Sequence, residues 1–166
     1  MELLIIFLLI LLNGLFSMSE IALVSSRKSR LESAAKRGDA NARIALDTAN
    51  HPTKFLSTVQ IGITLIGILT GIYSGENITN DLQLQLEQYP VLIPYAHSIA
   101  VAIVVILITF FSLIFGELIP KRIGLAYPEL ISKVMARPMK ALSFAVSPFV
   151  WLLTLTGDLF LKLFNI

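Results

Sequence analysis

The chain has 166 residues, of which 55% are hydrophobic and only 14% are charged, and its mean hydropathy is +0.79. An ordinary globular domain is about one quarter charged, so this composition excludes a disordered tail, a collagen-like fibre and a basic nucleic-acid-binding module. The chain contains no cysteine, which excludes a disulfide scaffold and any zinc or iron–sulfur site built on cysteine. The pI near 9.0 rests on a net charge of only +2. The composition is typical of an integral membrane protein.

Three apolar stretches are long enough to cross a bilayer, which takes about 20 helical residues. They cover about residues 3–24, 55–73 and 98–119. A cleaved signal peptide is the alternative for the first stretch, but its start carries Glu2 and no basic residue, and the basic residues follow the apolar run instead. We therefore predict an all-α integral membrane protein in which residues 1–166 form a single transmembrane domain with three transmembrane helices.

The basic residues indicate how these helices are oriented. Seven of the 13 lie between the first two predicted spans, six follow the third, and none lies between Phe55 and Pro120. The loop joining the second and third spans carries Glu76, Asp81 and Glu87 instead. Because positively charged loops stay in the cytoplasm, the pattern predicts an N-terminus outside and a C-terminus in the cytoplasm of a plasma (bacterial inner) membrane.

Two segments outside the spans are predicted to form a belt of juxtamembrane amphipathic helices at the cytoplasmic face. The first, residues 25–50, is polar, alanine-rich and basic, with apolar residues at near-helical spacing. The second, residues 128–166, is apolar enough from Ala141 onward for a fourth span. Pro148 interrupts it, and Asp158 and Lys162 stand near its end, so the belt is preferred and the fourth span stays open.

Polar side chains recur inside the predicted spans, where each is costly and therefore a functional candidate by default. They form two stripes, Asn13, Ser17 and Glu20 on one face of the first span and Ser57, Gln60 and Thr64 on one face of the second. For the serines and threonines, including Ser19, the simpler interpretation is a hydrogen bond to a carbonyl of their own helix. The amides of Asn13 and Gln60 fit that interpretation less well.

The third span ends in a sequence that predicts a helix break with a freed carbonyl. Pro120 has no amide hydrogen, so the carbonyl four residues earlier, that of Gly116, loses its helical partner. The carboxylate of Glu117 stands next to it. Broken helices that expose carbonyls to a cavity bind cations in transporters, and hard cations prefer oxygen ligands. The alternative makes Glu117 an interfacial carboxylate paired with Lys121 or Arg122.

These residues resemble the transmembrane domain of the CorC/CNNM family of magnesium transporters, over essentially the whole chain and in order. The matching motifs are Asn13–Ser17 with Glu20–Val24 in the first span, Pro52 with Phe55–Thr64 in the second, and Gly116–Lys121 at the end of the third.

The resemblance implies a homodimer embedded in membrane lipid that exports Mg²⁺ with sodium as the driving ion. It implies one dehydrated Mg²⁺ per protomer in a cytoplasm-facing cavity. Carried over by position, the ligands are Ser17, Ser57, the Gly116 carbonyl and Glu117, with Asn13, Ser19, Gln60 and Thr64 as near candidates.

The chain departs from the family pattern in one respect. The family usually continues into a cytoplasmic pair of CBS domains that bind ATP, whereas this sequence stops at Ile166. The chain is then a truncated piece or a minimal member, and ATP regulation is not carried over.

Two other function classes compete with transport. A membrane-anchored Mg²⁺ sensor or scaffold would use the same ligands without moving the ion. An intramembrane serine protease would need a base near a serine, but His51 and His97 lie outside the spans and no Gly-x-Ser-x-Gly elbow is present. We therefore expect no enzymatic activity.

Overall fold

A computed structural model of the chain describes residues 2–75 and 77–163, most of which are helical, with no strand among them. Three stretches within them are long and apolar enough to cross a membrane, Leu3–Ser25, Pro52–Leu86 and Ile93–Ala126. The predicted fold class, all-α with three membrane-spanning helices and further helices outside them, is therefore confirmed. The described residues divide into two compact units, one of residues up to Met18 with Gly62–Ile123 and one of Ser19–Ile61 with the residues from Gly124 onward.

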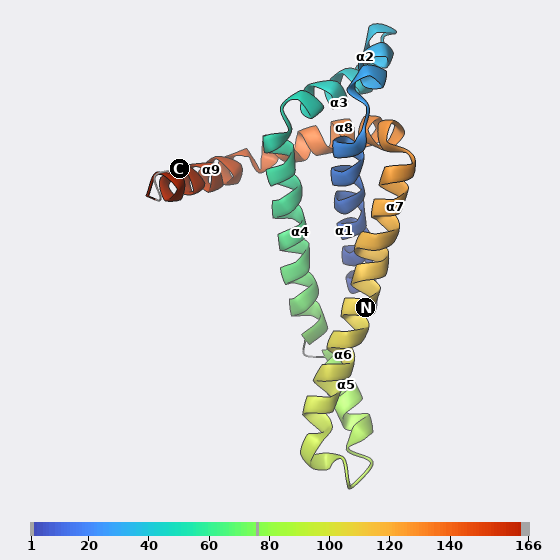
Figure 1. The fold of residues 1–166 in the computed structure, drawn as a ribbon. Coiled ribbons are helices and arrows are strands. Elements are labelled where there is room, and N and C mark those ends of the chain that lie inside the picture. Colours follow the sequence, from blue (N-terminus) through green and yellow to red (C-terminus); the bar gives the residue numbers. More distant parts are fainter. Residues whose placement is uncertain (1, 76, 164–166) are drawn as a thin grey trace. The chain divides into compact units, whose positions relative to one another are not determined.

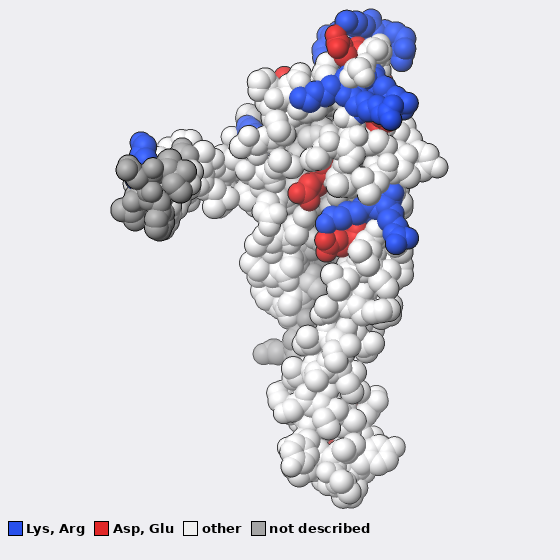
Figure 2. All heavy atoms as spheres, in the orientation of Figure 1, with Lys and Arg blue, Asp and Glu red and all other residues white. Residues whose placement is uncertain are grey.

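The first unit is built from apolar helices (Figure 1). It contains the start of α1 (Glu2–Ser25), most of α4 (Pro52–Gly75), α5 (Asn77–Leu86), the short 3₁₀ helix η1 (Ile93–Tyr95), α6 (Ala96–Leu113), the π-helical turn η2 (Ile114–Leu118) and the start of α7 (Ile119–Ala126). Helix α5 packs against α6, which buries Ala96, Ala100 and Val104 at intervals of four residues along one face. The rest of α6 exposes large apolar side chains, as a lipid-facing helix does. Figure 2 shows no charged side chain over α6.

The second unit gathers the polar helices α2 (Lys28–Lys36) and α3 (Ala40–Asn50) with α8 (Pro128–Ala145) and α9 (Ser147–Leu163). Leu31, Ala45 and Ala136 form a small buried core, and ion pairs join the helices around it. Lys133 Nζ lies 3.0 Å from Asp39 Oδ2, and Glu129 accepts the backbone N–H of Arg27. Figure 2 shows Lys and Arg side chains gathered over α2.

The segment predicted as one helical region over residues 25–50 is two helices with a tight turn between them. Gly38 adopts a φ of +94° there, a conformation that favours glycine. Asp39 then caps α3, because its Oδ1 accepts the backbone N–H groups of Asn41 and Ala42 at 3.0 Å. These bonds, with the Lys133 ammonium, hold the pKa of Asp39 below its usual range.

Helices α8 and α9 are bent by 70° relative to each other. Helix α8 ends at Ala145 and is capped by Val146, whose N–H bonds to the Leu142 carbonyl. Pro148 follows as the second residue of α9, where a proline is tolerated. The pair together is long and apolar enough for one broken span, so the fourth span stays an alternative. The Asp158 side chain on α9 lies outside the described residues, and so does Glu76 between α4 and α5.

Candidate functional site

The third apolar stretch widens at the predicted break and then continues as a helix. Over Ile114–Leu118 the backbone is π-helical, and the N–H of Ile119 bonds to the carbonyl of Ile114, five residues earlier. Pro120 is the second residue of α7, which runs on to Ala126. A π turn leaves backbone groups without their ordinary partners and is frequent at functional sites.

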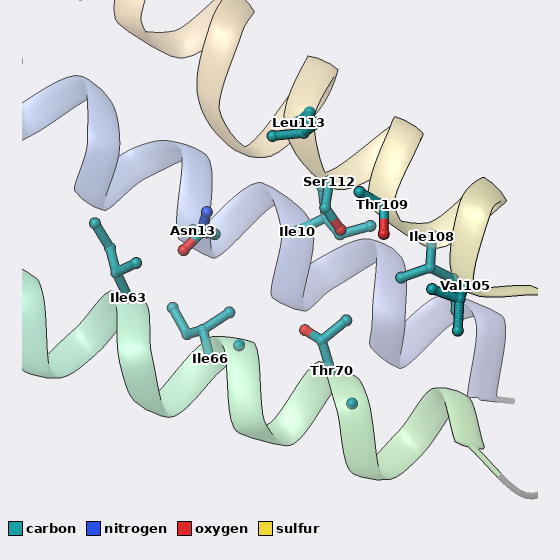
Figure 3. A pocket seen from close by; sticks show the side chains of 12 residues that line it. Ile10, Asn13, Ile63, Ile66, Thr70, Val105, Ile108, Thr109, Ser112 and Leu113 are labelled. Atoms are coloured by element: carbon teal, nitrogen blue, oxygen red, sulfur yellow. The ribbon is translucent and has the colours of Figure 1, made fainter.

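The Gly116 carbonyl takes its described partner from another helix. Asn13 Nδ2 on α1 donates a hydrogen bond to the Gly116 oxygen at 3.1 Å. Gly116 is buried, so its carbonyl needs such a donor once the proline has removed the helical one. The Asn13 amide oxygen lies on the side that faces α4 (Figure 3). One side chain therefore holds the carbonyl in place and presents an oxygen of its own.

Two glycines allow α1 to approach the π turn closely. A Cβ on Gly14 would lie 2.8 Å from the Phe115 carbonyl oxygen and 2.8 Å from Pro120 Cγ. A Cβ on Gly116 would lie 3.2 Å from Asn13 Nδ2. The sequence interpretation quoted Gly14 only as part of a motif. A signal was available, since a glycine directly after the polar Asn13 in an apolar span indicates close backbone approach.

Glu117 follows the buried carbonyl and points to a partly exposed position. Its Oε1 forms an ion pair with Lys121 Nζ one turn later, and the two side chains are 42% and 39% exposed. The alternative drawn from the sequence, a carboxylate paired with a neighbouring lysine, is thus present in this structure. Because the pair is exposed, its free energy is small, and Glu117 stays accessible to another cation.

The remaining candidate residues occupy different environments. Ser17 lies on α1 in the first unit and is buried, and Ser19 is buried in the second unit. Ser57 is half-buried and Gln60 is exposed, both on the part of α4 in the second unit, whereas Thr64 is exposed in the first unit. Among the described residues, the structure joins Asn13 to Gly116 and, as a separate pair, Glu117 to Lys121, all in the first unit.

The chemistry of this group suits a hard cation bound by neutral oxygens and one carboxylate. Within residues 2–75 and 77–163, no three His, Asp or Glu side chains gather into a metal-binding group. The oxygens that this part of the chain offers are instead the Gly116 carbonyl and the Asn13 amide, which lie together, and the carboxylate of the next residue, Glu117. Mg²⁺ binds through one or two carboxylates together with other oxygen ligands.

A cavity of about 410 Å³ lies next to Asn13 in the first unit. It is lined by α1, α4 and α6, with isoleucine, valine and leucine side chains and with the hydroxyls of Thr70, Thr109 and Ser112 (Figure 3). The simpler interpretation for serines and threonines in the predicted spans, a bond within their own helix, gives no reason to group these three hydroxyls.

Comparison with known proteins identifies the family of this chain. The sequence matches the family described as Cyclin M transmembrane N-terminal domain (CNNM) over residues 4–166. It is 49% identical over 166 residues to the UPF0053 protein sll0260 of Synechocystis sp., covering all of this chain and 37% of that protein. It is also 33% identical over 162 residues to the polyamine export protein of Haemophilus influenzae, covering 95% of this chain and 36% of that protein.

A third relative, the polyamine export protein of Salmonella typhimurium, is 32% identical over 162 residues, 98% of this chain and 36% of its own length. The chain thus spans a little over a third of the curated relatives it matches. The described fold and the match over nearly every residue lead to one conclusion. This chain belongs to the CNNM transmembrane domain family.

Proposed function

We propose that this domain exports Mg²⁺ from the cytoplasm across the membrane. The observation that carries the proposal is the Gly116 carbonyl, which is buried in a π turn and accepts its described hydrogen bond from Asn13 on another helix. In this proposal the carboxylate of Glu117, the next residue in the sequence, turns from Lys121 to the same ion, so that carbonyl and carboxylate together offer a dication two oxygen ligands. Helices interrupted at membrane depth bind coupling ions through such carbonyls in secondary transporters.

The complete ligand set in this proposal is Ser17, Ser57, the Gly116 carbonyl and Glu117, with Asn13, Ser19, Gln60 and Thr64 close by. The contacts around Gly116 support the Gly116 carbonyl and Asn13, whereas Ser17 and Glu117 are included by the resemblance. Ser57 belongs to the second unit, and its place in the set rests on the resemblance of the Phe55–Thr64 motif. Asn13 acts by holding the carbonyl, and its amide oxygen is available to the ion or to a water on it.

In the same proposal Lys121 competes with the dication for the Glu117 carboxylate. Its ammonium pairs with Glu117 in the ion-free protein, so Mg²⁺ must displace it to reach the carboxylate. The displaced ammonium then stays one helical turn away and can return when the ion leaves, which helps the carboxylate to release a tightly held dication.

The surrounding features of the proposal follow from charge distribution and family membership. The basic segments favour a C-terminus in the cytoplasm, and with three spans the N-terminus is then outside. The protomers form a homodimer, export is coupled to sodium entry, and CBS-type cytoplasmic domains regulate the protein where the chain continues as its longer relatives do.

Polyamine export is the second candidate, because relatives 32–33% identical over nearly the whole chain carry that name. A polyamine is also a polycation and would use the Glu117 carboxylate for one ammonium group. It differs from Mg²⁺ in needing no carbonyl or hydroxyl ligand set around a single point. The two cargoes therefore predict different roles for Gly116 and the serines.

Flux measured in proteoliposomes separates these candidates. We expect the purified chain to move Mg²⁺ down an imposed gradient, Glu117→Gln to abolish the flux, and an opposing sodium gradient to drive it. The matched control is Glu32→Gln, which removes an exposed carboxylate paired with Lys36 on α2. Flux of radiolabelled spermidine without Mg²⁺ flux would favour the second candidate, and Mg²⁺ binding without flux of either cation would favour a sensor.

A further inference from the structure

The cavity beside Asn13 carries a feature that the proposed ligand set does not use. Three hydroxyls from two helices, those of Thr70, Thr109 and Ser112, point into it together with the Asn13 side chain (Figure 3). The other lining residues named above are apolar, and no ionisable side chain is among the described residues that line it. A group of neutral oxygens at membrane depth needs a partner, since an unsatisfied hydroxyl in hydrocarbon is costly.

Other hydroxyls of this chain satisfy themselves within their own helix. Thr48, Thr58, Thr154 and Thr156 each donate to the carbonyl four residues earlier, at 2.7–2.9 Å. Within the described part of the chain, the three cavity hydroxyls make no such side-chain bond. Thr70 as a whole residue is only 8% exposed, and its side chain lines the cavity. The cavity is therefore the place where these hydroxyls find a partner.

The order of residues along each helix puts the cavity on one side of the proposed Mg²⁺ ligands. On α1, which starts outside, its lining residues precede Ser17, and on α6, which also runs inward, they precede Gly116. On α4, which runs outward, they follow Ser57. With the orientation given by the basic segments, all three helices place the cavity between the proposed ion site and the outer surface.

Its size and chemistry fit an ion with its water shell. Six waters, the octahedral shell of Mg²⁺, occupy about 180 Å³ at liquid density, and the cavity volume is about 410 Å³. Neutral hydroxyl and amide oxygens accept hydrogen bonds from the waters of a hydrated dication. With no carboxylate, the lining would hold the ion weakly, which suits a place that the ion must leave.

We propose that this cavity is the outer station of the export path, where the dehydrated Mg²⁺ regains water and is held through that water by Thr70, Thr109, Ser112 and Asn13. The inference rests on the proposed function and names a second, outer site for the same cargo. It predicts that water reaches the nearly buried Thr70 more readily than it reaches Ile68, which lies on the exposed, lipid-facing surface of the same helix.

Cysteine labelling tests the water-filled station without any transport assay, because the chain has no cysteine of its own. The variants are Thr70→Cys and, as matched control, Ile68→Cys on the same helix, where the isoleucine is 57% exposed. The probe is the membrane-impermeant reagent methanethiosulfonate ethyltrimethylammonium, applied from outside. Because it reacts with the thiolate, which needs water, we expect Thr70→Cys to react about ten times faster. Equal reaction rates for the two variants, or a Thr70→Cys variant that does not react, would overturn the proposal of a water-filled site at Thr70.

Flux tests the role of the hydroxyls. In proteoliposomes, Thr70→Val combined with Ser112→Ala should slow Mg²⁺ flux about tenfold while Mg²⁺ binding measured by calorimetry stays unchanged. Thr156→Val, which removes an exposed hydroxyl bonded within its own helix, should leave both unchanged. Normal flux in the double variant would overturn this inference alone. A wild-type protein without Mg²⁺ flux would instead overturn the proposed function, whatever the labelling shows.

Discussion

Gly14 and Gly116 show how single atoms control the approach of α1 to the π turn. At Gly14 an added Cβ meets a backbone oxygen and a proline ring at 2.8 Å, neither of which can rotate away. At Gly116 the nearest atom is the Asn13 amide nitrogen at 3.2 Å, the end of a side chain that can move. The same added methyl group is therefore expected to have different consequences at the two positions.

We predict that Gly14→Ala destabilises the protein by about 1–3 kcal/mol, the usual cost of overpacking, and that Gly116→Ala costs less. Gly67→Ala is the control, because a Cβ there meets nothing within 4 Å and alanine favours a helix over glycine by about 1 kcal/mol. Thermal unfolding in detergent ranks the three variants. A Gly14→Ala protein as stable as Gly67→Ala would contradict the close approach.

Lys121 gives a second test at this scale. If its ammonium competes with Mg²⁺ for Glu117, Lys121→Gln should bind Mg²⁺ two- to fivefold more tightly, which corresponds to the free energy of up to about 1 kcal/mol for an exposed ion pair. Calorimetric titration measures the change. Lys36→Gln, which breaks the exposed pair with Glu32 on α2, is the control. Weaker binding in Lys121→Gln would show that the lysine supports the site.

Among the elements, the stretch from α6 through the π turn to α7 depends on Pro120. Pro120→Ala restores an amide hydrogen that can bond to Gly116 in ordinary helical register. We predict weaker Mg²⁺ binding together with unchanged or greater stability without Mg²⁺, by up to about 3 kcal/mol. Calorimetry and thermal unfolding of the same sample check both halves. A less stable variant with normal Mg²⁺ affinity would limit the proline to packing against Gly14.

The turn between α2 and α3 predicts a pH dependence. The pKa of Asp39 is lowered by the Ala42 and Asn41 N–H groups and by Lys133, so its ionised form stabilises the folded second unit. This contribution is complete above the ordinary pKa of the carboxyl group and is lost as pH falls through the lowered one. Unfolding of wild type and Asp39→Asn as a function of pH should show a difference near neutrality that vanishes in acid. A difference that persists in acid would contradict it.

Comparison of these elements shows what a sequence can and cannot predict. The spans follow from uninterrupted apolar runs, and the loss of the Gly116 helical bond follows from Pro120 alone, because both are local. The Asn13 bond to Gly116 joins residues 103 positions apart, and the shared cavity of Thr70, Thr109 and Ser112 depends on how three helices face one another. No local feature of the sequence predicts either the hydrogen bond or the cavity. The split between α2 and α3 does have a local signal, the pair Gly38–Asp39, because glycine favours a turn and aspartate favours a helix N-cap.

For the whole molecule, orientation is the property on which both proposals depend, since "outer" and "cytoplasmic" have meaning only relative to the membrane. The distribution of lysine and arginine favours an N-terminus outside. The bent pair of α8 and α9 is the element that decides where the C-terminal end lies. As a belt it leaves that end in the cytoplasm, and as a broken fourth span it moves it outside.

Single cysteines in this cysteine-free chain distinguish the two arrangements. We predict that Gln85→Cys in intact cells reacts with an impermeant maleimide added outside, and that Arg37→Cys and Lys162→Cys react only after the membrane is permeabilised. Gln85, Arg37 and Lys162 are all exposed, so packing does not explain a difference between them. Labelling of Lys162→Cys in intact cells, with Arg37→Cys still protected, would show that α8 and α9 form a fourth span. Protection of Gln85→Cys together with labelling of Arg37→Cys would show that the protein has the opposite orientation in the membrane. The Thr70 cavity would then lie on the cytoplasmic side.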